Sequence, residues 1–203
     1  MQHLKTIYIM KKIILTVAAV FAFGFANAQS REKGTIEIIP QIGYATANYY
    51  GDAVQSGNST LSSVTYGVGG DYFFNDRWSL RTGLLFQTMG TSILSIEEKL
   101  SYMTIPVNAN WHFGSTRKWN LNFGPSVGFL TAAETDGQDI KKLVNSTQLG
   151  LNVGIGYKIE VSEELSILID YQSLTGLNNV AKDSDVKFKN SFGSFNVGVV
   201  FKL

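Results

Sequence analysis

The chain has no cysteine, and charged residues make up only 16% of its 203 positions. Without cysteine there is neither a disulfide framework nor the lipid-modified cysteine of a lipoprotein. Histidine is almost as scarce, because only two are present and only His112 lies beyond the N-terminal segment. A single imidazole excludes a multi-histidine metal site. We therefore expect no metal, no cofactor and no catalytic residues.

Apolar runs long enough to span a membrane as a helix are also missing. The apolar run from Ile13 to Phe25 has 13 residues, whereas a membrane-spanning helix needs about 20. Basic residues precede this run, and Ala26-Asn27-Ala28 follows it as a small-x-small cleavage site. These features predict a signal peptide over 1–28, with Met10 as a possible second start, and a single domain over 29–203 without a further module.

A strongly basic composition is absent as well. Removal of residues 1–28 takes away Lys5, Lys11 and Lys12, which leaves 14 basic and 16 acidic residues of the original 17 and 16. A net charge near −2 gives no electrostatic surface for polyanions. We expect no nucleic-acid partner.

The sequence is rich in two-residue alternation. Val64, Tyr66 and Val68 alternate with Thr65 and small residues, and successive side chains of a strand point to opposite faces of a sheet. The same pattern recurs in eight segments. We predict strands at 35–46, 62–73, 78 to the loop at 90, 100–113, 119 to the loop at 131, 147–159, 165–172 and 191–203.

The connections between these strands are alternately short and long. The short ones are 74–77, 114–118 and 160–164, and the long ones are 47–61, 90–99, 131–146 and 173–190. An up-and-down barrel with both ends of the chain on one side of a membrane has this arrangement, with brief turns inside and larger loops outside the cell. We predict an all-β fold, an eight-stranded antiparallel up-and-down transmembrane β-barrel.

Alternation does not by itself say which face points inward, since a secreted lipocalin-like barrel has its apolar face around a ligand. The small polar face decides for the membrane, because only small side chains fit the lumen of eight strands. Its glycines are Gly43, Gly67, Gly69, Gly83, Gly124, Gly128, Gly150, Gly154, Gly156 and Gly198.

The aromatic residues support the same orientation. Trp78, Trp111 and Trp119 each lie within a few residues of a short turn, and tryptophan favours the membrane interface because its ring is apolar while its N–H reaches water. This predicts an aromatic girdle at the short-turn end. A looser second girdle is expected from Tyr44, Phe86, Tyr102, Phe129 and Tyr171.

Pro40, Pro106 and Pro125 fall inside predicted strands. Each proline removes one ladder donor and is normally tolerated at bulges or edges. We expect local bulges at all three.

Four segments resemble a known family. They are Tyr102–Val107, Gly150–Tyr157, Asp170–Gln172 with Gly176–Asn179, and the closing Phe195–Phe201. They are similar to the PorT-like outer-membrane β-barrels typical of Bacteroidetes, which are related in architecture to the small barrels of the OmpA and OmpX type. The resemblance covers the mature chain and implies a Gram-negative outer membrane protein. It does not fix a role, because some PorT-like members are linked to protein secretion or gliding.

Two charge pairs are expected inside the barrel. Asp71 and Arg81 lie equally far from the turn that joins their strands, so a hairpin places them opposite each other, both facing the lumen. A gate is one interpretation of this pair, but a charge pair that plugs the interior is favoured. Glu37 and Lys202 are expected to pair across the seam between the first and last strands. The segment Gly67-Val68-Gly69-Gly70 is similar to a phosphate loop, but it lies within a predicted strand and no helix follows it, so Gly67 and Gly69 are interpreted as small lumen residues.

The remaining function is left to the loops. A contact surface is expected from Tyr49-Tyr50 in 47–61, from Ile93, Leu94 and Ile96 in 90–99, and from the charged segments 131–146 and 173–190. The alternative is that these residues pack within their loops. Related barrels include lipid-modifying enzymes, but His112 falls at the short-turn end, so we expect no enzyme. We predict a monomeric barrel in outer-membrane lipid with a structural or surface-interaction role and no open pore. The alternative is a narrow channel or an accessory component of protein secretion.

Overall fold

The computed structural model of the chain describes residues 31–51, 58–93, 96–182 and 185–203. The predicted signal peptide, 1–28, lies outside the described residues. Within those residues, no helix combines the length and the apolar character needed to cross a membrane. Almost all of the described chain is β-strand, and one short 3₁₀ turn, η1, covers Lys141–Leu143.

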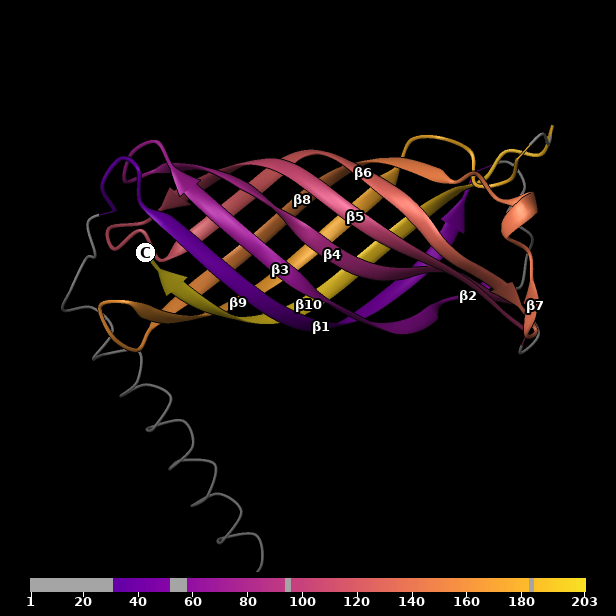
Figure 1. Ribbon diagram of the computed structural model, residues 1–203, viewed down its shortest axis with the longest axis horizontal. Helices are drawn as coiled ribbons and strands as arrows, with labels where there is room; N and C mark the ends of the chain where they lie inside the picture. The colour runs from indigo at the N-terminus through magenta and orange to yellow at the C-terminus, as the bar shows by residue number, and fades with distance from the viewer. Residues whose placement is uncertain (1–30, 52–57, 94–95, 183–184) are drawn as a thin grey trace, which may run out of the picture.

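Eight long strands and two short ones make a single sheet (Figure 1). The long strands are β1 (Ile36–Tyr50), β3 (Leu61–Phe73), β4 (Trp78–Ile93), β5 (Ile96–Phe113), β6 (Trp119–Thr135), β8 (Thr147–Glu160), β9 (Leu165–Gly176) and β10 (Lys189–Lys202). The two-residue strands β2 (Asn58–Ser59) and β7 (Gln138–Asp139) extend β4 and β6 at their edges.

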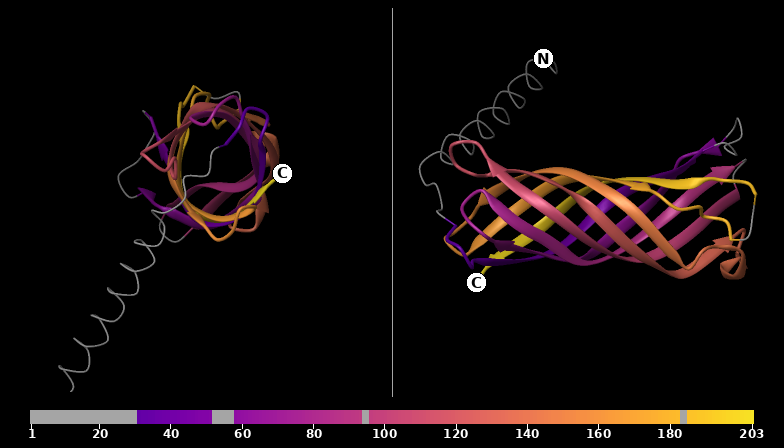
Figure 2. Two further views of the ribbon diagram at one scale, coloured as in Figure 1. Left: turned by 90° about the vertical axis from the view of Figure 1, so that its left-hand side faces the viewer. Right: turned by 90° about the horizontal axis from the view of Figure 1, so that it is seen from above.

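Each long strand pairs with the next in antiparallel fashion, and β10 returns to pair with β1. This last ladder runs from Glu37↔Lys202 to Tyr50↔Lys189 and closes the sheet into a ring, which Figure 2 shows in the view along the barrel. The predicted eight-stranded antiparallel barrel is therefore confirmed. The short turns and the C-terminus lie at one end of the barrel, and the longer connections lie at the other (Figure 1).

The observed strands are longer than the predicted ones and extend into all four predicted long loops. The largest difference is at 90–99, where β4 continues to Ile93 and β5 begins at Ile96. The prediction ended the strands where the outward residues cease to be apolar. Backbone pairing has no such requirement, so the ladders continue past the apolar band through outward residues such as Ser92.

The apolar face points outward, as predicted. Ile42, Tyr44 and Val64 are 57–60% exposed on the outer surface, whereas Glu37 and Asp71 on the opposite face are at most 2% exposed. The large exposed apolar side chains form a belt that soluble proteins of this size do not present to water. Hydrocarbon is the solvent that this surface fits.

Aromatic rings form a continuous row at the short-turn end. Trp78, Trp111, Phe113, Trp119 and Tyr157 contact one another in that order across β4, β5, β6 and β8, with ring centroids 4.8–6.3 Å apart. The predicted girdle is thus present. One member of the second girdle is wrong: Tyr102 is 2% exposed and points into the lumen, because it shares the inward face of β5 with residues such as Thr104.

The three prolines do not produce the expected bulges. Beside Pro106, the β4–β5 pairing stops at Thr82↔Val107 and resumes in unchanged register at Leu85↔Thr104. Pro40 and Pro125 are likewise passed without a shift. The register shift lies instead between Ser101 and Tyr102, opposite β6. A two-residue lapse in a ladder therefore accommodates each missing N–H donor.

Gly67 marks the closest approach of β3 and β4. A Cβ atom on Gly67 would lie 2.2 Å from the Leu84 carbonyl oxygen and 2.9 Å from the Leu85 Cα atom. On the same face of β3, a Cβ atom on Gly69 would have its nearest neighbour, the Thr82 carbonyl oxygen, at 3.7 Å. Only the first position therefore requires glycine for steric reasons.

This contrast gives a stability prediction. Gly67→Ala should lower the free energy of unfolding by about 1–3 kcal/mol, because the added methyl group forces two backbones apart. Gly69→Ala is the matched control and should leave stability unchanged or slightly higher. Urea titration of the protein in lipid vesicles, followed by heat-modifiable gel migration, measures both. Equal midpoints for the two variants would contradict the proposed close packing.

Candidate functional site

The barrel interior contains a charged centre built around Asp71 and Arg81. The turn after β3 places the two residues opposite each other in the β3–β4 ladder. Arg81 Nη2 lies 2.8 Å from Asp71 Oδ2, and Arg81 Nε donates to Asp71 Oδ1 at 3.0 Å. This bidentate geometry is the strongest form of an arginine–carboxylate pair. The predicted ion pair is confirmed.

The centre extends across the lumen to the opposite wall. Arg81 Nη1 lies 3.5 Å from Asp170 Oδ2 on β9. Asn110 on β5 donates to both oxygens of Asp71 at 3.2 and 3.3 Å, and Lys158 on β8 places its Nζ atom 3.5 Å from Asp71 Oδ2. Asp71 therefore has partners from three other strands, and the pair is part of a network rather than an isolated hairpin contact.

Glu37 joins this network instead of pairing with Lys202. The register does place Glu37 opposite Lys202, but the Glu37 carboxylate is bound by Lys158 Nζ and by Arg31 Nε, the latter at 2.8 Å. Arg31 precedes β1 and also donates to the Arg117 carbonyl oxygen in the β5–β6 turn, at 3.2 Å. The predicted Glu37–Lys202 ion pair is wrong, because the inward carboxylate finds two cations within the lumen.

We call this set the ionic cluster. It holds three cations and three anions, namely Arg31, Arg81, Lys158, Glu37, Asp71 and Asp170. All six side chains are less than 10% exposed. Buried charges are tolerated when they are paired and hydrogen-bonded, and equal numbers of each sign meet that condition. The ionic cluster thus fills the lumen near the short-turn end.

His112 lies beside the ionic cluster. Its Nε2 atom is 2.9 Å from Ser79 Oγ, and its ring packs on Phe73 with centroids 4.7 Å apart. A serine–histidine–acid triad needs a carboxylate on the second imidazole nitrogen, but His112 Nδ1 has no hydrogen-bond partner among the described residues. The imidazole is also fully buried. The described contacts of Ser79 and His112 therefore do not form such a triad.

The described residues do not support a metal site either. In the described part of the chain, no group of three or more histidine, cysteine or carboxylate residues has the arrangement to hold a metal ion. The carboxylates of the ionic cluster are instead neutralised by arginine and lysine.

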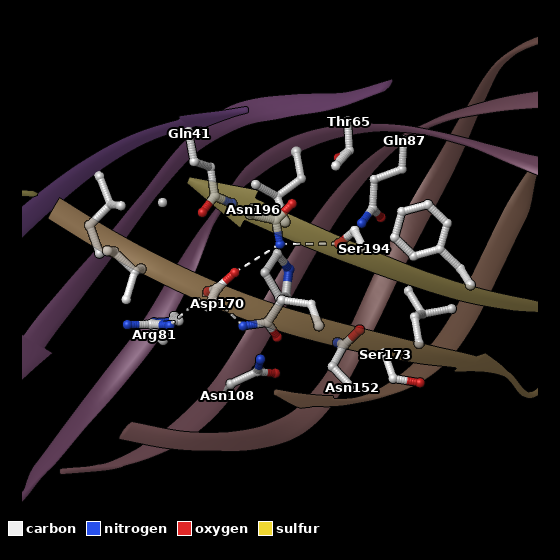
Figure 3. Close-up of a pocket in the computed structure, with 18 of the residues that line it drawn as sticks. Gln41, Thr65, Arg81, Gln87, Asn108, Asn152, Asp170, Ser173, Ser194 and Asn196 are labelled. Atoms are coloured by element: carbon white, nitrogen blue, oxygen red, sulfur yellow. Dashed lines mark hydrogen bonds and ion pairs between the residues drawn. The ribbon is translucent and has the colours of Figure 1, made fainter. Parts of the chain in front are cut away.

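A cavity with both polar and apolar lining residues lies inside the barrel (Figure 3). Its volume is about 50 Å³, enough for a few water molecules at about 10–15 Å³ each. Amide side chains line it, including Gln87 and Asn108, whose Oε1 and Oδ1 atoms have no hydrogen-bond partner among the described residues. Asp170 borders it from the ionic cluster, and Asn196 donates to Asp170 at 2.8 Å.

Between the cavity and the long connections, a cluster of buried apolar side chains fills much of the lumen, and the sequence did not predict it. We call this cluster of buried side chains the apolar plug. Its members are Ala45, Ala47, Tyr49, Met89, Leu100, Tyr102, Leu130, Ala133, Val144, Leu174, Val180 and Phe192. Tyr49, expected on a loop surface, is an inward residue of β1 that is 8% exposed and donates to Glu98. Four of its members are strand residues that were predicted to lie in loops, namely Ala47, Tyr49, Ala133 and Leu174.

Val144 and Val180 enter the apolar plug from the long connections. The segments that carry them, 140–146, 177–182 and 185–188, are called the loop cap here. Val144 pairs with Ala181 in an isolated β-bridge, so the two connections are joined to each other over the barrel mouth.

Asparagine side chains hold the loop cap together. Asn145 Nδ2 donates to the Asn179 carbonyl oxygen at 2.9 Å, and Asn179 Oδ1 accepts from the Phe188 backbone N–H at 2.9 Å. Asn178 binds the backbone near the start of β8, where its Oδ1 atom accepts from the Leu149 N–H at 2.7 Å. These contacts satisfy backbone groups that a loop otherwise exposes. The predicted loops 131–146 and 173–190 are therefore ordered where the structure describes them.

The loop cap carries exposed apolar side chains. Leu143 is 66% exposed, Val186 53% and Leu177 45%. Ile93 and Ile96, predicted as loop residues, are instead exposed at the facing ends of β4 and β5; Leu94 lies outside the described residues. Tyr50 was also predicted on a loop surface. It is instead a strand residue whose hydroxyl group donates to the Gly176 carbonyl oxygen.

Comparison with known proteins agrees with this architecture. The sequence model of the outer membrane protein β-barrel domain family matches residues 15–202. Neisserial surface protein A has a similar structure, with a TM-score of 0.55 and 18% identity over 84% of this chain and 99% of that protein. The outer membrane protein OprG of Pseudomonas aeruginosa has a TM-score of 0.54 and 14% identity over 87% and 99%. No curated protein sequence matches the chain.

The ionic cluster gives a second stability prediction. Arg81→Ala should lower the free energy of unfolding by about 3–5 kcal/mol, because it leaves two buried carboxylates short of a cation. The control is Lys99→Ala, which breaks the exposed Lys99–Glu97 pair at 2.6 Å and should cost no more than about 1 kcal/mol. Urea unfolding in vesicles measures both. An Arg81→Ala variant as stable as the control would contradict the network.

Proposed function

This chain belongs to the outer membrane protein β-barrel domain family and lies in the outer membrane, and from that premise we propose that it is a closed barrel whose loop cap binds a partner at the cell surface. One observation carries the proposal: the lumen is filled, and the groups left for contact are on the ordered loop cap. The long-loop end is taken to face outward, since long connections of such barrels are extracellular.

The filling of the lumen argues against an open pore. The ionic cluster, the small cavity and the apolar plug follow one another along the axis, and the cavity between them holds only about 50 Å³. Eight strands enclose an interior that side chains fill. Steady flow of ions or solutes through the barrel would require both the ionic cluster and the apolar plug to move apart.

The loop cap has the properties of a contact surface. Its backbone is fixed by hydrogen bonds to asparagine side chains, so binding does not have to order a free loop. Leu143 and Leu177 expose apolar side chains on it, and loops positioned by a rigid scaffold commonly carry binding residues. A protein with an apolar patch of its own is the partner that this surface fits.

Three further assignments from the sequence remain predictions. A non-catalytic role is supported by the buried position of His112 and by its unbound Nδ1 atom. Membership of the PorT-like group of Bacteroidetes rests on the four sequence segments that suggested it. A monomeric state is supported by the closed sheet, because the described strands offer no long free edge for pairing with a second copy.

Conductance separates a closed barrel from the alternative of a narrow channel. The purified protein in planar lipid bilayers should give no stepwise ion current, because paired charges and packed apolar side chains block the axis. A variant that widens the plug, Phe192→Ala, provides the comparison, since it removes a fully inward ring. Regular current steps from the wild-type protein would exclude the closed barrel proposed here.

Cross-linking in intact cells tests the contact surface. A photo-crosslinking amino acid in place of Leu143 should form a discrete adduct with a surface partner. The control is the same replacement at Val161, which is 58% exposed but lies in a short turn at the other end of the barrel. Adducts at Val161 but not at Leu143 would favour an accessory role on the inner side of the membrane, as in secretion, over surface binding.

A further inference from the structure

The outer wall of the barrel has an apolar groove near the aromatic row. Its volume is about 470 Å³, within the range of ligand pockets, about 300–1,000 Å³. The residues that line it come from the β3–β4 turn, β4, β5 and β6. They are Phe74, Trp78, Ser79, Leu80, Val107, Ala109, Phe123, Gly124 and Pro125.

Ala109 forms the low point of this groove. It faces outward on β5, and the ladders place Leu80 of β4 on one side and Phe123 of β6 on the other. A methyl group between two large side chains leaves a channel along β5. Trp111 and Trp78 stand at its short-turn end, where they pair with each other across the strands.

A proline interrupts the ladder beside the groove. The β5–β6 pairing stops at Ala109↔Phe123 and resumes at Pro106↔Ser126, so the ladder lapses next to Pro125. Pro125 lines the groove and fixes the outward surface of β6 there. The groove thus follows from a small residue and a proline on adjacent strands.

The β3–β4 turn, which contributes Phe74 to the groove, also carries a cation. Arg77 is exposed and directly precedes Trp78 in the β3–β4 turn, and its carbonyl oxygen accepts from the His112 backbone N–H at 2.6 Å. The neighbouring acid, Asp76, is paired with Arg117 at 3.1 Å. Because Asp76 is paired with Arg117, Arg77 adds a positive charge to the β3–β4 turn next to Trp78, at the depth where tryptophan rings meet the headgroups.

We propose that this groove is a binding site for one phospholipid molecule, with an acyl chain along β5 over Ala109 and the phosphate against Arg77. The groove faces hydrocarbon and carries no polar lining except Ser79, which fits an alkyl chain. The arginine in the β3–β4 turn complements an anionic phosphate. The bound lipid differs from the surrounding bilayer lipid because its acyl chain contacts Leu80 on one side, Phe123 on the other and Ala109 between them.

Native mass spectrometry of the full-length protein in mild detergent tests the site, with phosphatidylglycerol added as the probe. The wild-type protein should bind a first lipid more tightly than later ones. Ala109→Phe fills the groove and should weaken that first binding about tenfold, because the acyl chain loses its buried methylene contacts. The matched control is Val199→Phe, an outward position on β10 at the opposite wall, which should change nothing.

The headgroup contact has its own pair of variants. Arg77→Gln should weaken the first binding step, whereas Lys33→Gln, which removes an exposed cation from the same end of the barrel, should not. Heat-modifiable gel migration verifies that each variant is folded. Equal lipid binding by Ala109→Phe and Val199→Phe, or a wild-type series of adducts without a preferred first lipid, would overturn the proposal.

Discussion

The structure depends on the ladder that joins β1 to β10. In hydrocarbon an unpaired backbone N–H or C=O costs several kcal/mol, so a sheet whose outer face is apolar must close on itself. The pairs from Glu37↔Lys202 to Tyr50↔Lys189 provide that closure between the two ends of the sequence. The same constraint explains the prolines, which sit where the ladder lapses for two residues and then continues in register.

Closure of only eight strands creates the second constraint, a narrow lumen that side chains have to fill. The chain fills it in two ways. Near the short turns, six charges of balanced sign bind one another; near the long connections, apolar side chains pack together and are covered by Val144 and Val180. Glycine is used where two backbones approach, as at Gly67. The result is a barrel without a free axis, whose contacts are left to its loop cap and its lipid-facing wall.

Much of the fold could be predicted from the sequence, because two-residue alternation and hairpin geometry are local properties of the chain. A period of two fixes which residues share a face, and the equal distance of Asp71 and Arg81 from one turn fixes their pairing. The remaining members of the ionic cluster could not be found in this way. Lys158 binds Glu37 across 121 positions of sequence, and no local pattern connects them. The wrong Glu37–Lys202 ion pair has the same cause. The two residues do lie opposite each other, but the local pattern does not show that Lys158 and Arg31 compete for the Glu37 carboxylate.

The sequence by itself determined the class of fold, the number of long strands, the outward apolar face and the aromatic row at the short-turn end. These follow from the spacing of residue types along each strand and from the solvent on each side. The tertiary structure alone decided what fills the lumen, how far the strands extend and where the wall is grooved. Those features depend on residues from different strands at one height in the barrel, such as Leu80, Ala109 and Phe123, and that height is set only when all eight strands have closed.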